Sequence, residues 1–112
     1  MVNPVASRNP AYTLDDIRAA AKLCRIRYDG RKVNADIRNL GYTQNDVARC
    51  IAGLTAGDFR KSLAYPYRVY DVYISRFQFS DDGTPDEIYM KLRLLDNGEL
   101  TIGTIGIGSF HL

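Results

Sequence analysis

The sequence predicts an α+β fold, in which helices from the first half of the chain pack on one face of a small antiparallel sheet. Apolar residues recur at helical spacings of three and four up to Leu54, and at every second position after Pro66. Clusters of Gly, Pro, Asn and Asp separate these segments. The 112 residues, 46% hydrophobic and 25% charged, are ordinary for one globular domain that buries its own core.

The first predicted helix begins at Thr13, after an irregular leader over residues 1–12, and residues 13–112 form a single domain. Residues 13–16 (TLDD) have the form of a capping box in which Asp replaces the preferred Glu. We expect residues 28–30 (YDG) to end this element. The residues that form its apolar face are Leu14, Ile17, Ala21 and Cys24.

Two more helices are predicted before residue 55. Asn34 is expected to cap a short helix over residues 35–40, which stops at Gly41. Thr43 begins a third helix with a second capping signal. The residues that supply the buried face of this third helix are Val47, Cys50, Ile51 and Leu54.

The pattern then changes from helix to strand. Thr55 repeats the capping signal and predicts a short helical turn that continues through residues 59–62, until Pro66 prevents its extension. Residues 69–79 are rich in Tyr, Val, Ile and Phe, which is typical of a strand.

Two further strands complete the predicted sheet. Residues 81–86 form a turn cluster, and apolar and polar residues alternate over residues 87–94, as expected of a strand with one buried face. Asn97 and Gly98 are a strong hairpin signal, and residues 100–112 form the returning strand. The residues expected in the core include Leu14, Ile17, Val47, Ile51, Leu54, Met90, Leu92 and Ile102.

Composition excludes several classes of site. Cys24 and Cys50 have no Cys or His at ligand spacing, so we expect two reduced, buried cysteines in a cytoplasmic protein. His111 is the single histidine, and no metal site or cofactor is predicted. The formal net charge is +2, with +5 in residues 1–67 and −3 in residues 68–112. The basic first half suits a polyanionic partner, although charged helix faces give the same pattern.

Membrane insertion and secretion are not expected. The chain has no run of eighteen apolar residues that could form a transmembrane helix. Residues 1–12 lack the apolar segment of a secretory signal. The patterns of a Ser-His-Asp hydrolase, a phosphate-binding loop and a dinucleotide-binding fold are also missing.

The candidates for function are polar and aromatic residues of the predicted sheet. Tyr89, Lys91 and Arg93 share one strand face, where they could stack on a base and hold phosphate, or simply face solvent. Asp71 could orient a cation or face water. A group of tyrosines around Arg68 could stack single-stranded RNA bases or be half-buried strand residues: Tyr65, Tyr67, Tyr70 and Tyr73.

Basic residues outside this group offer further chemistry. Arg60 and Lys61 could neutralise a phosphate, or be an ordinary exposed pair. His111 could act as a general acid or base, because histidine exchanges protons near neutral pH, although most lone histidines are incidental.

Several segments together resemble the MqsR family of bacterial toxins. The most specific is residues 51–62 (IAGLTAGDFRKS). Residues 71–73 (DVY), 88–92 (IYMKL) and 109–111 (SFH) match further family blocks in the same order, and residues 34–41 fit as well. The resemblance covers about residues 13–112.

This resemblance implies a RelE-like α+β fold and an endoribonuclease that cleaves mRNA at short motifs to arrest growth. It implies metal-independent cleavage, in which the 2′-OH of the RNA attacks the adjacent phosphate. It also implies a cognate MqsA-like antitoxin, through which the complex binds operator DNA.

The resemblance also suggests site residues. The family's functional Lys, strand Tyr and C-terminal basic residue fall on Lys61, Tyr89 and His111. Tyr70 stands where the family has Gln, and Ile74 where it has Arg, with Arg76 as a possible substitute.

We expect His111 to protonate the leaving 5′-oxygen and Lys61 to stabilise charge on the phosphate. Tyr70 or Tyr89 would orient or deprotonate the 2′-OH. The residues expected to bind RNA are Arg60, Arg68, Arg76, Lys91 and Arg93. The alternatives are a non-catalytic RNA- or protein-binding module on the same fold, or a domain that serves only assembly.

Overall fold

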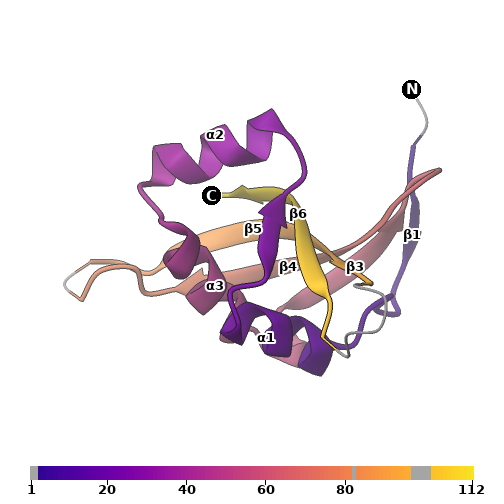
Figure 1. The fold of residues 1–112 in the computed structure, drawn as a ribbon, viewed down its shortest axis with the longest axis horizontal. Helices are drawn as coiled ribbons and strands as arrows, with labels where there is room; N and C mark the ends of the chain where they lie inside the picture. The colour runs from indigo at the N-terminus through magenta and orange to yellow at the C-terminus, as the bar shows by residue number, and fades with distance from the viewer. Residues whose placement is uncertain (1–2, 82, 97–101) are drawn as a thin grey trace.

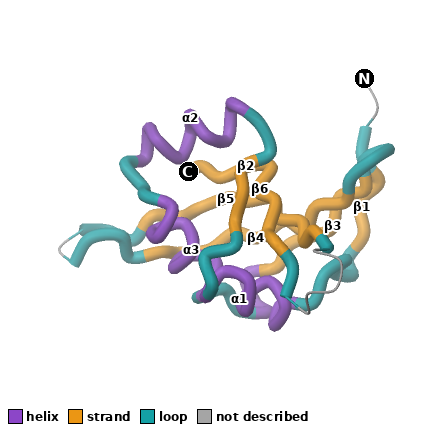
Figure 2. Tube along the Cα trace, viewed as in Figure 1, coloured by secondary structure: helices purple, strands orange, loops and turns teal. Residues whose placement is uncertain are grey.

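Three helices pack on one side of a six-stranded sheet in the computed structural model, which describes residues 3–81, 83–96 and 102–112 (Figures 1 and 2). The predicted α+β class is therefore confirmed. The elements in chain order are β1 (Val5–Ser7), α1 (Leu14–Lys22), β2 (Ile26–Tyr28), α2 (Arg31–Leu40), α3 (Gln44–Ala52), the 3₁₀ turn η1 (Ala56–Asp58), β3 (Phe59–Ala64), β4 (Val69–Phe77), β5 (Asp86–Leu95) and β6 (Thr104–His111).

The strands lie in the order β1-β3-β4-β5-β6-β2. All neighbours are antiparallel except β2, which pairs in parallel with β6. Neither edge strand, β1 or β2, is predicted from the sequence, because a three-residue strand is too short to display a periodic pattern. The leader is thus not wholly irregular, since Val5–Ser7 pairs with β3.

The first two helices differ from the prediction at their ends. Thr13 is the N-cap of α1 as expected, but its side chain makes no capping hydrogen bond. The helix ends at Lys22, and Cys24 then takes a positive φ of 55° before the chain enters β2. Helix α2 starts at Arg31 rather than after Asn34, because Gly30, at a φ of 126°, supplies the reversal that begins it.

Capping boxes at Thr43 and Thr55 form as predicted. The Asp46 backbone N–H donates to the Thr43 hydroxyl at 3.2 Å, and the Asp46 carboxylate accepts from the Thr43 N–H at 2.8 Å. The second box, at Thr55, supports only the short turn η1.

The helical turn predicted over residues 59–62 is wrong. Phe59 has an extended backbone with φ −66° and ψ 136°, and the residues after it pair with β4 as strand β3. Lys61 therefore lies on a strand.

The core lies between the helices and one face of the sheet. The residues buried there from the sheet are Ile26, Tyr73, Ile88, Met90, Leu92, Ile105, Ile107 and Phe110. The predicted core members Leu14 and Ile102 are only partly buried against it. Cys50 is buried but Cys24 is only half-buried. The predicted hairpin at Asn97 and Gly98 lies outside the described residues.

Asp71 neither faces water nor lies exposed to a cation. It is fully buried, and its carboxylate accepts hydrogen bonds from the backbone N–H groups of Ala11 at 2.9 Å and Tyr12 at 3.0 Å. Strand β4 therefore anchors the N-terminal segment just before α1.

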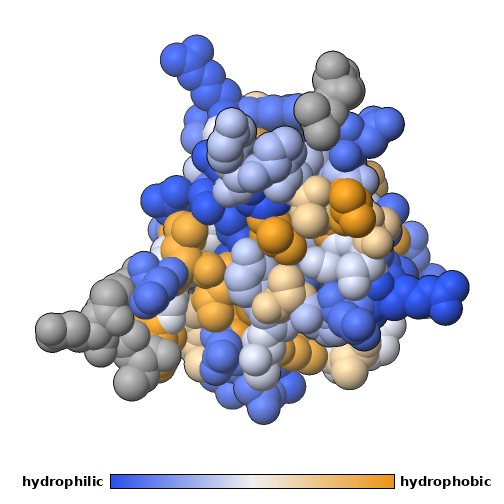
Figure 3. All heavy atoms as spheres, turned by 90° about the vertical axis from the view of Figure 1, so that its right-hand side faces the viewer, coloured by the Kyte–Doolittle hydropathy of each residue, from blue (hydrophilic) through white to orange (hydrophobic). Residues whose placement is uncertain are grey.

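The side of the molecule that carries β1 is mixed in character. In Figure 3, hydrophobic residues lie in small groups between hydrophilic ones, and several hydrophilic side chains project around them. Among the described residues, no helix is long and apolar enough to span a membrane.

Candidate active site

The face of the sheet opposite the helices, here called the open face, gathers the predicted site residues. Because Met90 and Leu92 point into the core, Lys91 between them points to the open face. The strand register places Lys61 of β3 beside Val72 of β4, Val72 beside Lys91, and Lys91 beside Ser109 of β6. Two lysines thus lie in one row, separated by a single strand.

The neighbouring row on the open face joins Ile74 of β4, Tyr89 of β5 and His111 of β6. The rings of Tyr89 and His111 stack, with centroids 5.2 Å apart and planes 23° from parallel. His111 Nδ1 lies 3.0 Å from the backbone oxygen of Leu112. When Nδ1 donates to that oxygen, Nε2 is the nitrogen left to exchange a proton with a ligand.

Lys61, Tyr89 and His111 therefore come to one face from three different strands. Lys61 is exposed, whereas the other two are half-buried. The ammonium group of Lys61 forms no salt bridge among the described residues. The arrangement offers a cation, a hydroxyl and an imidazole to one ligand.

Tyr70 and Arg93 also lie on this face, but Asp29 holds both of them. Arg93 donates to the two carboxylate oxygens of Asp29 at 2.7 and 3.1 Å, and the Tyr70 hydroxyl donates to Asp29 at 2.8 Å. The Asp29 side chain is only 1% exposed. Arg27, at 3.5 Å, and Arg68, at 4.0 Å, add more distant positive charge.

These contacts set the protonation of the cluster. Burial alone would raise the pKa of Asp29, but hydrogen bonds from Arg93 and Tyr70, together with the charges of Arg93 and Arg68, lower it overall. Burial raises the pKa of Tyr70. The Tyr70 hydroxyl is therefore a hydrogen-bond donor to a carboxylate and is poorly suited to act as a base.

Two glycines of β6 make room for this cluster. A Cβ on Gly106 would lie 2.8 Å from an Asp29 oxygen, and a Cβ on Gly108 would lie 2.7 Å from the Tyr70 ring. Gly108 is the extra residue of a bulge, because Lys91 pairs with Ser109 and Leu92 with Ile107. The glycine-rich strand thus accommodates Tyr70 and Asp29.

The remaining basic candidates fall in two places. Arg68 and Lys91 line a pocket beside Tyr70. Arg60 and Arg76 line a second pocket of about 450 Å³, together with Ile74 of the His111 row. The Tyr89–His111 pair therefore lies between two pockets that each contain two of the predicted RNA-binding cations.

Asp29 is the residue that sequence reasoning missed. The pattern of residues 28–30 predicts only the end of a helix, although an alternating run before a turn can also indicate a short strand. Groups of three or more His, Cys, Asp or Glu side chains able to hold a metal ion do not occur in the ranges that the structure describes.

The resemblance to a known family is borne out by comparison. A family model described as "Motility quorum-sensing regulator, toxin of MqsA" matches residues 9–105. Individually curated proteins gave no match. The matched span covers most of the 112 residues. The chain therefore belongs to the MqsR family, the toxins of toxin–antitoxin systems whose partner is MqsA.

Proposed function

We propose that this toxin is an endoribonuclease that cleaves mRNA at short sequence motifs without a metal ion and so arrests growth. Family membership supports the toxin role. The observation that carries the catalytic part is the stacked Tyr89–His111 pair, which shares the open face with Lys61.

In the proposed reaction, the 2′-oxygen of one nucleotide attacks the adjacent phosphorus. A new bond forms between the 2′-oxygen and phosphorus, and the bond from phosphorus to the 5′-oxygen of the next nucleotide breaks. His111 in its protonated form gives a proton from Nε2 to the leaving 5′-oxygen. The products are a 2′,3′-cyclic phosphate and a free 5′-hydroxyl.

Tyr89 has the orienting role at the start of the reaction. A tyrosine hydroxyl is a weak base at neutral pH, so we assign it the task of accepting a hydrogen bond from the 2′-OH. The proton of the 2′-OH then passes to solvent water. Stacking against His111 holds the Tyr89 ring in place.

Lys61 stabilises the negative charge that develops on the phosphate oxygens. A donor directed at the charge that develops in the transition state typically contributes about 10²–10³ in rate. The exposed ammonium has no competing carboxylate in a salt bridge within the described residues.

Tyr70 and Arg93 receive positioning roles rather than direct contact with the reacting atoms. Hydrogen bonds to the buried Asp29 carboxylate hold both side chains in fixed positions on the open face. We assign RNA backbone contacts to Arg60, Arg68, Arg76 and Lys91 instead. The same toxin would bind an MqsA-like antitoxin, and through it operator DNA.

A non-catalytic binding module on the same fold is the second candidate. The specific observation that favours it is Ile74, an apolar residue directly beside Tyr89 where the family resemblance expects Arg. Under this alternative the open face would bind RNA or protein without cleaving it.

The test is cleavage of synthetic single-stranded RNA by the purified chain in excess EDTA, with products identified by mass. We expect 2′,3′-cyclic phosphate ends, and no cut at a linkage whose 2′-OH is replaced by hydrogen. Lys61→Ala and His111→Ala should lose about 10²-fold or more in rate. Lys32→Ala is the matched control, because that lysine is 85% exposed on α2, away from the open face. Intact RNA with a folded wild-type protein would favour the binding module.

A further inference from the structure

The turn between β3 and β4 forms one wall of a pocket of about 310 Å³ on the open face. This volume is at the lower end of the range of small-molecule sites, about 300–1,000 Å³. The residues that line it and carry the inference are Tyr65, Tyr67, Arg68, Tyr70, Lys91 and Gly108.

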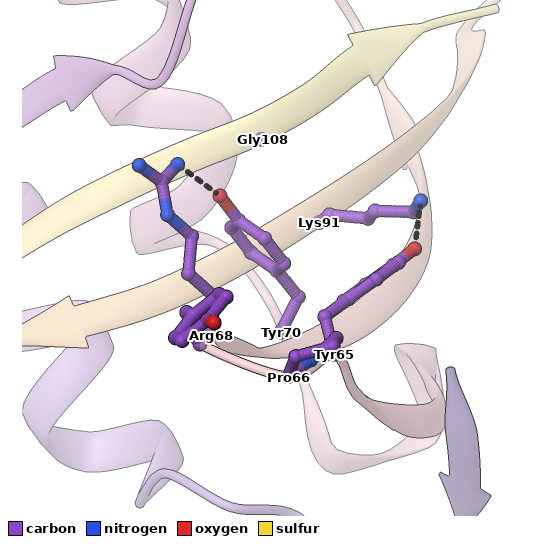
Figure 4. Close-up of a pocket in the computed structure, with 7 residues that line it drawn as sticks. Tyr65, Pro66, Arg68, Tyr70, Lys91 and Gly108 are labelled. Carbon is purple, nitrogen blue, oxygen red and sulfur yellow. Dashed lines mark hydrogen bonds between the residues drawn. The ribbon is translucent and has the colours of Figure 1, made fainter. Parts of the chain in front are cut away.

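Two aromatic walls of the pocket are held in place by cations. Lys91 Nζ donates to the Tyr65 hydroxyl at 2.7 Å and lies 5.3 Å from the centre of the Tyr65 ring. Arg68 donates to the Tyr70 hydroxyl at 3.3 Å. The Tyr65 and Tyr70 rings meet edge to face, with centroids 6.1 Å apart. Figure 4 shows both rings reaching from the hairpin toward Lys91 and Gly108.

The third aromatic residue, Tyr67, lies at the rim with 97% of its surface exposed. A ring so exposed has almost no packing within the chain, so it is available to stack on a ligand that enters the pocket. It is the most exposed of the large hydrophobic residues in the part of the chain that the structure describes.

The charge of the pocket is positive. Arg68 and Lys91 both contribute to the lining, and none of the lining residues in the described part of the chain is acidic. Asp29 is only 1% exposed and does not line the pocket; its carboxylate accepts hydrogen bonds from Arg93 and Tyr70 and lies 4.0 Å from Arg68. A planar, electron-rich ligand attached to an anion fits this combination of tyrosines and cations.

We propose that this pocket holds the base of one unpaired nucleotide next to the phosphate that is cleaved. The inference rests on the proposed ribonuclease function and adds a binding subsite to it. Lys91 connects the pocket with the proposed catalytic residues, since it lines the pocket and lies two residues from Tyr89 on β5. Two residues span about 7 Å along a strand, which is within the reach of one nucleotide.

Base stacking explains the composition better than phosphate binding alone does. A phosphate needs cations but no aromatic walls, whereas every base has a face that stacks on tyrosine. A single position of the RNA, adjacent to the cleaved linkage, should therefore depend on the tyrosines.

The experiment measures binding of the full chain to fluorescent RNA by anisotropy. The linkage to be cleaved carries a 2′-deoxy nucleotide, so the measurement does not depend on catalysis. Each flanking position in turn is made abasic. At one position we expect the loss of the base to weaken wild-type binding about five- to a hundredfold. Tyr67→Ala should weaken binding of the intact RNA similarly and remove the effect of the abasic change at that position.

The controls separate stacking from unfolding. Tyr67→Phe keeps the ring and should bind like wild type, and the exposure of Tyr67 means that its removal leaves the core intact. Phe79→Ala removes a ring that is 41% exposed on the hairpin between β4 and β5, outside the pocket, and should bind as wild type does.

The inference is overturned if abasic changes weaken wild type and Tyr67→Ala equally at every position. It is also overturned if Tyr67→Ala binds RNA normally but loses the cognate antitoxin, which would make the pocket a protein site. A failure of the ribonuclease proposal would look different. In that case binding would still depend on the base and on Tyr67, but an RNA with ribose at every position would not be cleaved.

Discussion

Replacing Asp29 by alanine should lower the free energy of unfolding by about 3–5 kcal/mol. This carboxylate is 1% exposed and accepts two hydrogen bonds from Arg93 and one from Tyr70. Its loss leaves the Arg93 guanidinium, only 13% exposed, without its salt-bridge partner among the residues that the structure describes. Removing one partner of a buried ion pair typically costs about 3–5 kcal/mol.

The Tyr70 hydroxyl would still accept from Arg68 but would lose the acceptor of its own proton, which by itself would cost about 1–3 kcal/mol. We do not add this figure in full, because both groups belong to one network and interacting groups are not additive. The cost remains a large share of the roughly 5–15 kcal/mol that stabilises a typical domain.

The assay is equilibrium urea unfolding followed by circular dichroism. With a slope of about 1–3 kcal/mol per molar urea, the midpoint should fall by at least about 1 M for Asp29→Ala. Asp36→Ala is the matched control, since it breaks an i,i+4 pair with Lys32, which is 85% exposed. Such pairs contribute only about 0.3–0.5 kcal/mol. The reasoning is refuted if Asp29→Ala unfolds within about 1 kcal/mol of that control.

The Asp29 carboxylate, the bulge at Gly108 and the cap of α3 can each be tested by one substitution. The pKa of Asp29 is lowered in the folded chain, so its contribution to the free energy of unfolding is present above the ordinary pKa of 3.8 and is lost as the pH falls below it. The difference in stability between wild type and Asp29→Asn should therefore shrink in acid unfolding below that pH. Gly108→Ala places a Cβ 2.7 Å from the Tyr70 ring, and should cost about 1–3 kcal/mol in urea unfolding. Thr43→Ala removes one half of the capping box of α3, and should lower the thermal midpoint through a loss of about 0.5–2 kcal/mol.

Local patterns in the sequence predicted the long elements well. The alternation along β5 predicted that Met90 and Leu92 are buried and that Tyr89 and Lys91 share the other face, and the structure places them so. The capping signal at Thr43 likewise formed as expected. In both cases the information lies within a few residues.

Features that depend on distant partners could not be predicted. Strand β2 exists because Ile26 pairs with Ile105, and no local signal of three residues encodes such a contact. The local sequence around Asp29 is typical of a turn, but its hydrogen-bond partners Tyr70 and Arg93 are 41 and 64 positions away in the chain. The buried role of Asp71 similarly depends on the N-terminal segment.

The sequence predicts which residues form the candidate site, but it does not predict how they are arranged in space. The resemblance suggested Lys61, Tyr89 and His111, while the pattern around Thr55 placed Lys61 on a helical turn. The strand register brings Tyr89 opposite His111 and puts Lys61 on the same face. Tyr70 was expected beside the reacting groups; its hydroxyl donates to Asp29, and we propose a positioning role for it.

The central proposal is tested most directly by inducing the chain in bacteria and mapping new 5′ ends across total RNA. We expect wild type to arrest growth and to produce cuts at a recurrent short motif, and co-expression of the cognate antitoxin to suppress both. Lys61→Ala and His111→Ala should grow normally with intact RNA, at soluble levels equal to those of wild type. Normal growth and intact RNA from soluble, folded wild type would contradict the ribonuclease proposal.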